Sequence, residues 1–160
     1  MPRPRPEPTG PGQESVWDYP RPPRLERSDR HVRVTAGDVV VADTRSAWRV
    51  LETSHPPVLY VPLADVAAGV LTPTGRTSYC EFKGIAAYWT VLGLADAAWS
   101  YPQPSPGYAA MAGAVAFYPS LLSCTIDGVA VRPQAGGFYG GWITDDVVGP
   151  FKGEPGTLGW

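Results

Sequence analysis

Cysteine, histidine and lysine are scarce in this sequence, which holds two of each among its 160 residues. Cys80 and Cys124 lie far apart, so the chain has no Cys-x-x-Cys pair. No cysteine and histidine share the spacing of a structural zinc site. We therefore predict neither a disulfide framework nor a bound metal, and the sequence gives no sign of a cofactor.

Long apolar runs are also missing. No stretch of about 18 apolar residues is present, which argues against a helical membrane span. Met1 leads into alternating proline and arginine rather than into an apolar leader. The net charge of −2 gives little general attraction to nucleic acid. We expect a soluble cytoplasmic protein with neither a nucleic-acid nor a membrane partner.

Glycine and proline are abundant, with 18 and 19 residues. This composition disfavours long helices and favours short strands joined by tight turns. Alternating apolar residues predict a mainly β, antiparallel domain, with its clearest hairpin over 31–43 around a turn at Gly37. One short helix is predicted near 106–113, because Ser105 could cap it and Pro106 suits its first position.

Four parts are predicted along the chain. Residues 1–13 are expected to form a flexible arm of arginine and proline. Residues 14–30 carry Trp17 and Tyr19, whose large apolar area favours packing on the domain. The β core is predicted over 31–133. A glycine-rich and aromatic segment over 134–160 is expected to wrap over that core.

The most informative stretch is Tyr-Cys-Glu-Phe-Lys-Gly-Ile at 79–85. If it is an extended strand, Glu81 and Lys83 share one face while Cys80 lies on the other. An unpaired buried ammonium costs several kcal/mol. Lys83 is therefore expected either to pair with a carboxylate or to face a ligand, and the available partners are Glu52, Glu81 and Asp65.

Other candidate site residues each have a structural alternative. Glu52 could be an isolated inward carboxylate, in a pocket whose aromatic walls are Tyr60, Trp99 and Tyr118; the same rings could also be core. Cys80 could be a nucleophile if a cation lowers its pKa, or a small buried apolar residue. His55 could act as a base, although we expect an exposed loop histidine.

Several segments occur in an order that resembles a known family. They are Glu-Ser-Val-Trp-Asp-Tyr-Pro at 14–20, Val-Leu-Glu-Thr-Ser-His-Pro-Pro at 50–57, Tyr-Cys-Glu-Phe-Lys-Gly at 79–84, Ala-Trp-Ser-Tyr-Pro at 98–102, Val-Ala-Phe-Tyr-Pro at 115–119 and Gly-Gly-Phe-Tyr-Gly-Gly-Trp-Ile-Thr at 136–144.

Together these segments resemble domain-of-unknown-function family 427, which comprises small, mainly bacterial proteins. The resemblance runs from about residue 14 onward. It implies a β-tent, in which two antiparallel sheets lean together near right angles above a cavity. The family sometimes carries a nucleotidyltransferase-like label. The chain has no glycine-rich phosphate loop of the type Gly-x-x-x-x-Gly-Lys-Ser/Thr, and its one adjacent acidic pair is Asp145-Asp146.

Three functions stay open. The preferred hypothesis is a small-molecule-binding domain with a pocket between the two sheets, in which Tyr60, Trp99 and Tyr118 supply walls and Glu52 and Lys83 supply polar anchors. The first alternative is an enzyme of unassigned reaction, such as a transferase, using Cys80 or Glu52 with Lys83. The second alternative is a protein-interaction scaffold that uses the arm over 1–13.

Overall fold

The computed structural model describes residues 3–160, and this part of the chain is mainly β. The strands are β1 Glu14–Ser15, β2 Arg24–Arg27, β3 Val32–Ala36, β4 Val39–Thr44, β5 Trp48–Leu51, β6 Val58–Val61, β7 Leu71–Cys80, β8 Gly84–Val91, β9 Leu94–Ser100, β10 Val115–Phe117, β11 Ser123–Ile126, β12 Val129–Ala130, β13 Arg132–Pro133, β14 Trp142–Ile143 and β15 Val147–Val148. Three short 3₁₀ helices are η1 Val16–Asp18, η2 Leu63–Asp65 and η3 Pro106–Met111. Within residues 3–160, no helix has the length and apolar character needed to cross a bilayer.

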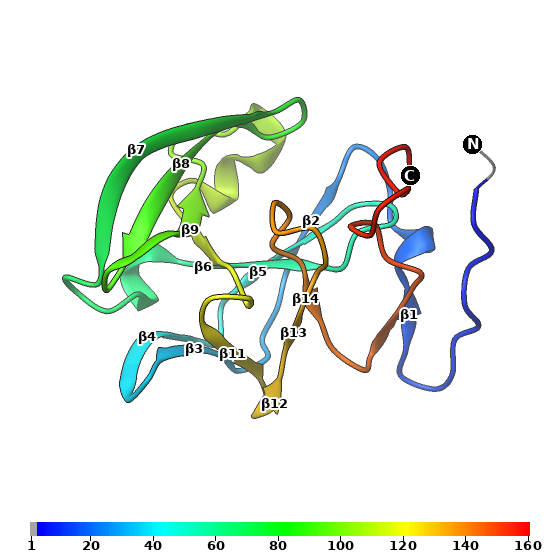
Figure 1. Ribbon diagram of the computed structural model, residues 1–160, viewed down its shortest axis with the longest axis horizontal. Helices are drawn as coiled ribbons and strands as arrows, with labels where there is room; N and C mark the ends of the chain where they lie inside the picture. Colours follow the sequence, from blue (N-terminus) through cyan, green and yellow to red (C-terminus); the bar gives the residue numbers. More distant parts are fainter. Residues whose placement is uncertain (1–2) are drawn as a thin grey trace.

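Seven strands form the larger sheet, in the order β2-β5-β6-β10-β9-β8-β7. Every neighbouring pair in it is antiparallel. In Figure 1 this sheet arches over the molecule, with β7 and β8 forming the raised end. Strand β2 lies at the opposite edge from β7. It is the first strand of this sheet in the sequence and begins at Arg24.

Four strands form the smaller antiparallel sheet, in the order β12-β11-β3-β4. The predicted hairpin is present as β3 and β4, joined by a turn in which Gly37 has a φ of 57°. Glycine adopts that backbone conformation without the strain that a Cβ atom would cause. Figure 1 shows this sheet below the arch of the larger one.

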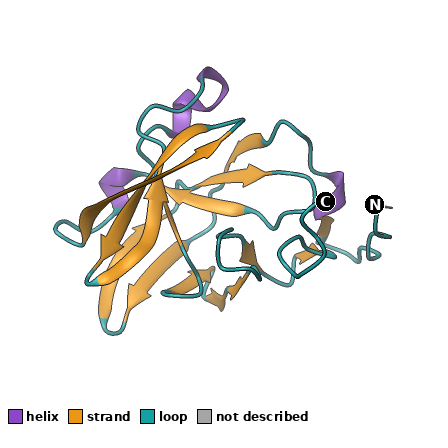
Figure 2. Ribbon diagram, turned by 45° about the horizontal axis from the view of Figure 1, so that its top comes forward, coloured by secondary structure: helices purple, strands orange, loops and turns teal. Residues whose placement is uncertain are grey.

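The main apolar core fills the space between these two sheets. The smaller sheet contributes Val32, Val34 and Val41, and the larger contributes residues such as Leu59 and Phe117. All five are at most 2% exposed. Side chains on a strand alternate between faces, so the residues between these positions point to the other face of the larger sheet. Figure 2 shows the strands of both layers, with the short helices at their margins.

The predicted helix near 106–113 is present as η3, a 3₁₀ helix that begins at Pro106. Ser105 does not cap it with its side chain. Its main-chain N–H instead donates to the carbonyl of Lys83 at 3.0 Å. The helix is therefore tied to the turn between β7 and β8.

Both ends of the described chain meet on one side of the molecule, as Figure 1 shows. Strand β1 pairs in parallel with β15, so Glu14 lies opposite Val147. Trp17 and Tyr19 are buried beside this pair. Before β1, the Arg3 guanidinium lies 4.9 Å from the centre of the Trp17 ring, and the N–H of Glu7 donates to the Gly149 carbonyl at 2.9 Å.

Candidate functional site

A pocket of about 310 Å³ lies on the face of the larger sheet that points away from the smaller sheet. The prediction of a pocket between the two sheets was therefore wrong about its place, because apolar side chains fill that space. The pocket is instead enclosed by one face of the larger sheet and by the C-terminal segment. Its lining includes Glu52, His55, Tyr60, Cys80, Glu81, Lys83, Tyr88, Trp99, Tyr101, Tyr118, Gln134, Phe138, Tyr139, Gly140 and Lys152.

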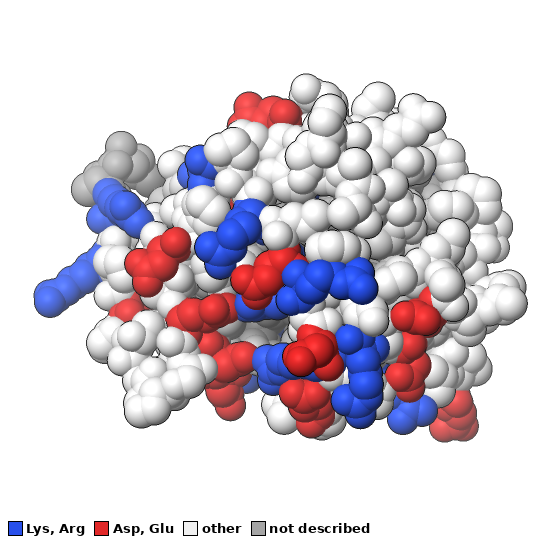
Figure 3. Space-filling view, turned by 180° about the vertical axis from the view of Figure 1, so that it is seen from behind, with Lys and Arg blue, Asp and Glu red and all other residues white. Residues whose placement is uncertain are grey.

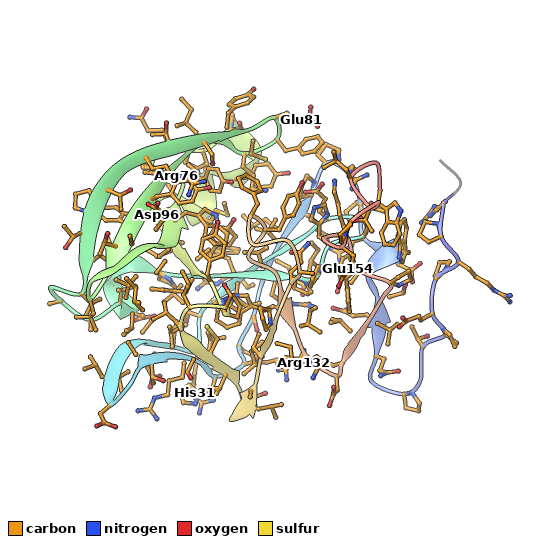
Figure 4. All side chains as sticks on the ribbon, viewed as in Figure 1. His31, Arg76, Glu81, Asp96, Arg132 and Glu154 are labelled. Carbon is orange, nitrogen blue, oxygen red and sulfur yellow. The ribbon has the colours of Figure 1, made fainter. Side chains whose placement is uncertain are left out.

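The turn between β7 and β8 places Lys83 in this pocket. Strand β7 ends at Cys80 and residues 81–83 form the turn, so the condition of an extended strand over 79–85 is not met. Gly84 then opens β8 with a φ of 106°. Because of this turn, Cys80 and Lys83 do not lie on opposite faces, and both line the pocket. Glu81 also borders the pocket, but its side chain is exposed at the hairpin tip (Figure 4).

Lys83 is 9% exposed and has no carboxylate within 4.0 Å among residues 3–160. Its Nζ lies 5.7 Å from the centre of the Tyr101 ring, a cation–π contact, and beside the Cys80 thiol. Burial alone would lower the pKa of Lys83, but Tyr101, Cys80 and Glu52 outweigh it and raise the pKa above its ordinary value. Lys83 is thus a buried, charged ammonium without a carboxylate partner in the described part of the chain.

The three partners proposed for Lys83 are engaged or placed elsewhere. Glu52 accepts a hydrogen bond from Arg21 Nε at 3.1 Å. Glu52 directly follows β5, and because it pairs with Arg21 it is not the isolated carboxylate that was expected. Asp65 accepts from Thr44 Oγ1 at 2.7 Å, and Glu81 is exposed to solvent.

His55 is buried at 8% exposure, and the expectation of an exposed loop histidine was wrong. Its Nδ1 lies 3.0 Å from the Thr53 carbonyl oxygen and 3.8 Å from Glu52 Oε2. Its ring packs edge to face on Tyr139. Burial lowers the pKa of His55, although the nearby Glu52 carboxylate opposes this change.

The larger sheet forms one wall of the pocket, and this wall is made of aromatic rings. Tyr60 on β6, Trp99 on β9 and Tyr118 after β10 are each at most 7% exposed. The Trp99 and Tyr118 ring centres are 4.6 Å apart. Trp99 Nε1 donates to the Tyr60 hydroxyl at 3.3 Å, and the Tyr118 hydroxyl donates to the Phe138 carbonyl at 2.8 Å. The predicted rings therefore stand together, and their role in ligand binding stays a prediction.

The opposite wall comes from the C-terminal segment, which sequence reasoning did not include in the site. Gly140 lies against Trp99 so closely that a Cβ atom built on it would be 2.2 Å from a ring carbon. Lys152 also lines the pocket, with its Nζ 5.4 Å from the centre of the Tyr139 ring. The signal for Lys152 was present in the sequence, since Phe-Lys-Gly occurs at 82–84 and again at 151–153.

A second hollow, of about 410 Å³, has different chemistry. Acidic and basic side chains line it, and five of its seven charged residues pair with one another: Glu14, Glu26, Arg30, Arg49 and Asp146. Arg49 binds both Glu14 and Glu26, and Arg30 donates to Asp146 at 2.6 Å. Figure 3 shows acidic and basic side chains interleaved across the rear face of the molecule. Because most of these charges are paired, the aromatic pocket is the stronger site candidate.

Metal-ligating side chains are not grouped in the described part of the chain. Residues 3–160 contain no cluster of three or more histidine, cysteine, aspartate or glutamate side chains that could hold a metal ion. Both cysteines are free, with Cys80 half-buried at the pocket and Cys124 buried in the core between the sheets. Burial raises the pKa of the Cys124 thiol to about 12.

Comparison with protein families gives one match. The model of NTP_transf_9, described as a domain of unknown function (DUF427), matches residues 24–131. This range runs from the first residue of β2 to just beyond β12 and so covers both sheets. Comparison with curated proteins found no significant match. The match covers more than half of the chain, which therefore belongs to the DUF427 family.

Proposed function

We propose that this protein is a small-molecule-binding domain whose ligand occupies the aromatic pocket. The observation that carries the proposal is the ammonium of Lys83, which is 91% buried and lacks a carboxylate partner. Burying a charge without an opposite charge costs several kcal/mol. A fold that holds such a group in an aromatic pocket is organised for a molecule that supplies the missing partner.

The size and lining of the pocket support the same proposal. Small-molecule sites have volumes of about 300–1,000 Å³, with apolar walls and a few convergent polar groups. A pocket of about 310 Å³ falls at the lower end of that range. Its aromatic wall can cover the flat or apolar body of a ligand, and Lys83 can orient the polar end. Glu52 also lines the pocket and stays a predicted polar anchor for the ligand, although it is paired with Arg21.

A specific contact favours a second candidate, an enzyme that uses Cys80. The Cys80 thiol lies beside the Lys83 ammonium. A nearby cation stabilises a thiolate, which is the nucleophilic form of cysteine. In this alternative, the Cys80 thiolate adds to a carbonyl carbon of the ligand, the carbonyl π electrons move onto the oxygen, and Lys83 stabilises the negative charge on that oxygen.

A thermal-shift screen of metabolites tests the two candidates together. The library contains anionic, neutral and cationic compounds, and it is applied to the wild type and to Lys83→Met. Met keeps the length and apolar stem of lysine, so removing an unpaired charge should leave the melting temperature unchanged or raised. We expect ligands that stabilise the wild type more than the variant.

Mass spectrometry of the stabilising compounds then separates binding from turnover. A ligand recovered unchanged supports the binding domain. Conversion that stops in Cys80→Ser supports the enzyme. A screen in which no compound stabilises the wild type would contradict the proposed function.

A further inference from the structure

Both lysines of the chain line the same pocket. Lys83 reaches it from the turn between β7 and β8, and Lys152 reaches it from the C-terminal segment. Every other cation of the sequence is an arginine or a histidine. Each lysine follows a phenylalanine and precedes a glycine, and each ammonium lies near a tyrosine ring, Tyr101 or Tyr139.

No aspartate or glutamate carboxylate lies within 4.0 Å of either ammonium in the part of the chain that the structure describes. Lys83 donates no hydrogen bond to a described oxygen atom, and Lys152 reaches one oxygen of Trp160, the last residue of the printed sequence, at 3.5 Å. A distance of 3.5 Å lies beyond the usual 2.7–3.2 Å range for such bonds. Both donors therefore keep hydrogen-bonding capacity for a ligand.

The negative charges of the pocket are compensated or face solvent. Glu52 is bound by Arg21 at 3.1 Å, with His55 at 3.8 Å. Glu81 is exposed at the tip of the hairpin, where water screens its charge (Figure 4). The uncompensated charge inside the pocket is consequently positive.

From this arrangement we propose that the ligand is an organic anion, whose carboxylate, phosphate or sulfonate group binds Lys83 and Lys152 while an aromatic or apolar body packs on Trp99 and Tyr118. This inference names the ligand class of the proposed function and rests on that function. Hydrogen bonds between an ammonium and an oxyanion are about twice as strong as neutral ones. Burial of Lys83 strengthens its attraction to an anion further, since the surrounding dielectric is low.

A pair of dyes that differ in one charged group tests the inference. 1-Anilinonaphthalene-8-sulfonate and N-phenyl-1-naphthylamine share the same ring system, and only the first carries a sulfonate. Both become fluorescent in apolar pockets, so titration gives a Kd for each. We expect the wild type to bind the sulfonate at least about 10-fold more tightly than the neutral dye.

Four variants locate the effect. Lys83→Met should weaken binding of the sulfonate by about 10-fold or more without changing binding of the neutral dye. Lys152→Met should weaken it by a smaller factor, and Lys83→Arg should restore part of the affinity. Arg132→Met removes the same charge from an exposed site that does not line the pocket and should change neither Kd.

Displacement of the sulfonate dye identifies the oxyanion. Benzoate and phenyl phosphate are each compared with benzamide, which has the ring but no charge. We expect the charged compounds to displace the dye, and the one effective at lower concentration reports whether the site prefers carboxylate or phosphate.

The outcomes separate the two proposals. Equal affinity for both dyes, or a sulfonate affinity that Lys83→Met leaves unchanged, would overturn the anion inference and leave the binding pocket intact. If neither dye binds and the metabolite screen is also empty, the proposed function itself fails.

Discussion

At Gly140, a side chain of even one carbon would collide with Trp99. A Cβ atom there would lie 2.2 Å from one ring carbon of Trp99 and 2.6 Å from the next. The ring is held by Tyr60 and Tyr118 and has little room to move. The requirement for glycine at this position thus comes from close packing between the C-terminal segment and the sheet.

We predict that Gly140→Ala lowers the free energy of unfolding by about 1–3 kcal/mol, because overpacking forces either the segment or the ring aside. Urea denaturation followed by circular dichroism measures the change. Gly107→Ala is the matched control, since a Cβ atom at Gly107 would meet nothing within 4 Å. Equal effects of the two substitutions would contradict this account of the packing.

His55 should make stability depend on pH. Burial lowers its pKa in the folded protein below the ordinary value of 6.5, so the unfolded chain binds a proton at a higher pH than the folded protein. Stability is therefore complete above 6.5, and it falls as the pH drops from 6.5 toward the lowered pKa. We expect His55→Gln to reduce this slope between pH 7 and pH 5, measured by urea midpoints.

The other histidine provides the control. His31→Gln keeps His55, so the fall in stability over the same pH range should persist in that variant. If the slope disappears in His31→Gln and survives in His55→Gln, the assignment to His55 is wrong.

At the scale of elements, local patterns in the sequence predicted the strands and turns well. The hairpin of β3 and β4 and the helical turn beginning at Pro106 both follow from short-range preferences. The reversal between β7 and β8 was expected at Gly84, and the structure places its turn at 81–83, because Tyr-Cys-Glu-Phe has the alternation of a strand and only Gly84 indicates a change of direction. The candidate site residues were proposed one at a time, as large rings or charges within apolar segments, and their role stays a prediction.

What the sequence did not predict depends on contacts between distant elements. The alternation within one strand does not show which face of the larger sheet packs on the smaller sheet and which face carries the pocket. The burial of His55 and the approach of Lys152 both require the C-terminal segment to cross that face. The partner of Glu52 is Arg21, which comes from a proline-rich region without strand periodicity.

The arm before β1 is predicted to contribute little to stability. Residues between Arg3 and Gln13 are mostly exposed, and their few hydrogen bonds are exposed or part-buried. Deleting residues 1–13 should lower the free energy of unfolding by about 1 kcal/mol. By contrast, Trp17→Ala should cost about 3–5 kcal/mol, since that ring is buried. Thermal and urea unfolding compare the two, and a deletion as costly as Trp17→Ala would show that the arm is part of the core.

Considered as a whole, the molecule carries one thiol on each side of its larger sheet. Cys80 lines the pocket, and Cys124 lies in the core between the sheets with a pKa raised to about 12. Iodoacetamide reacts with thiolates, so at pH 8 we expect Cys80 to be alkylated at least about 10-fold faster than Cys124. Peptide mass spectrometry over time gives both rates.

Unfolding provides the comparison for these rates. In urea the two cysteines should react at similar rates, because both are then exposed. An anion that occupies the pocket should slow Cys80 alone. Faster reaction at Cys124 in the folded protein would contradict the placement of the two thiols.

The parallel pairing of β1 with β15 has a consequence for the order in which the protein is made. The ribosome produces Glu14 early, yet its partner Val147 follows only after both sheets have been synthesised. Until then the apolar surface around Val16 and Trp17 has no cover from Val147. A nascent chain is consequently expected to expose this surface until its late segment has been synthesised.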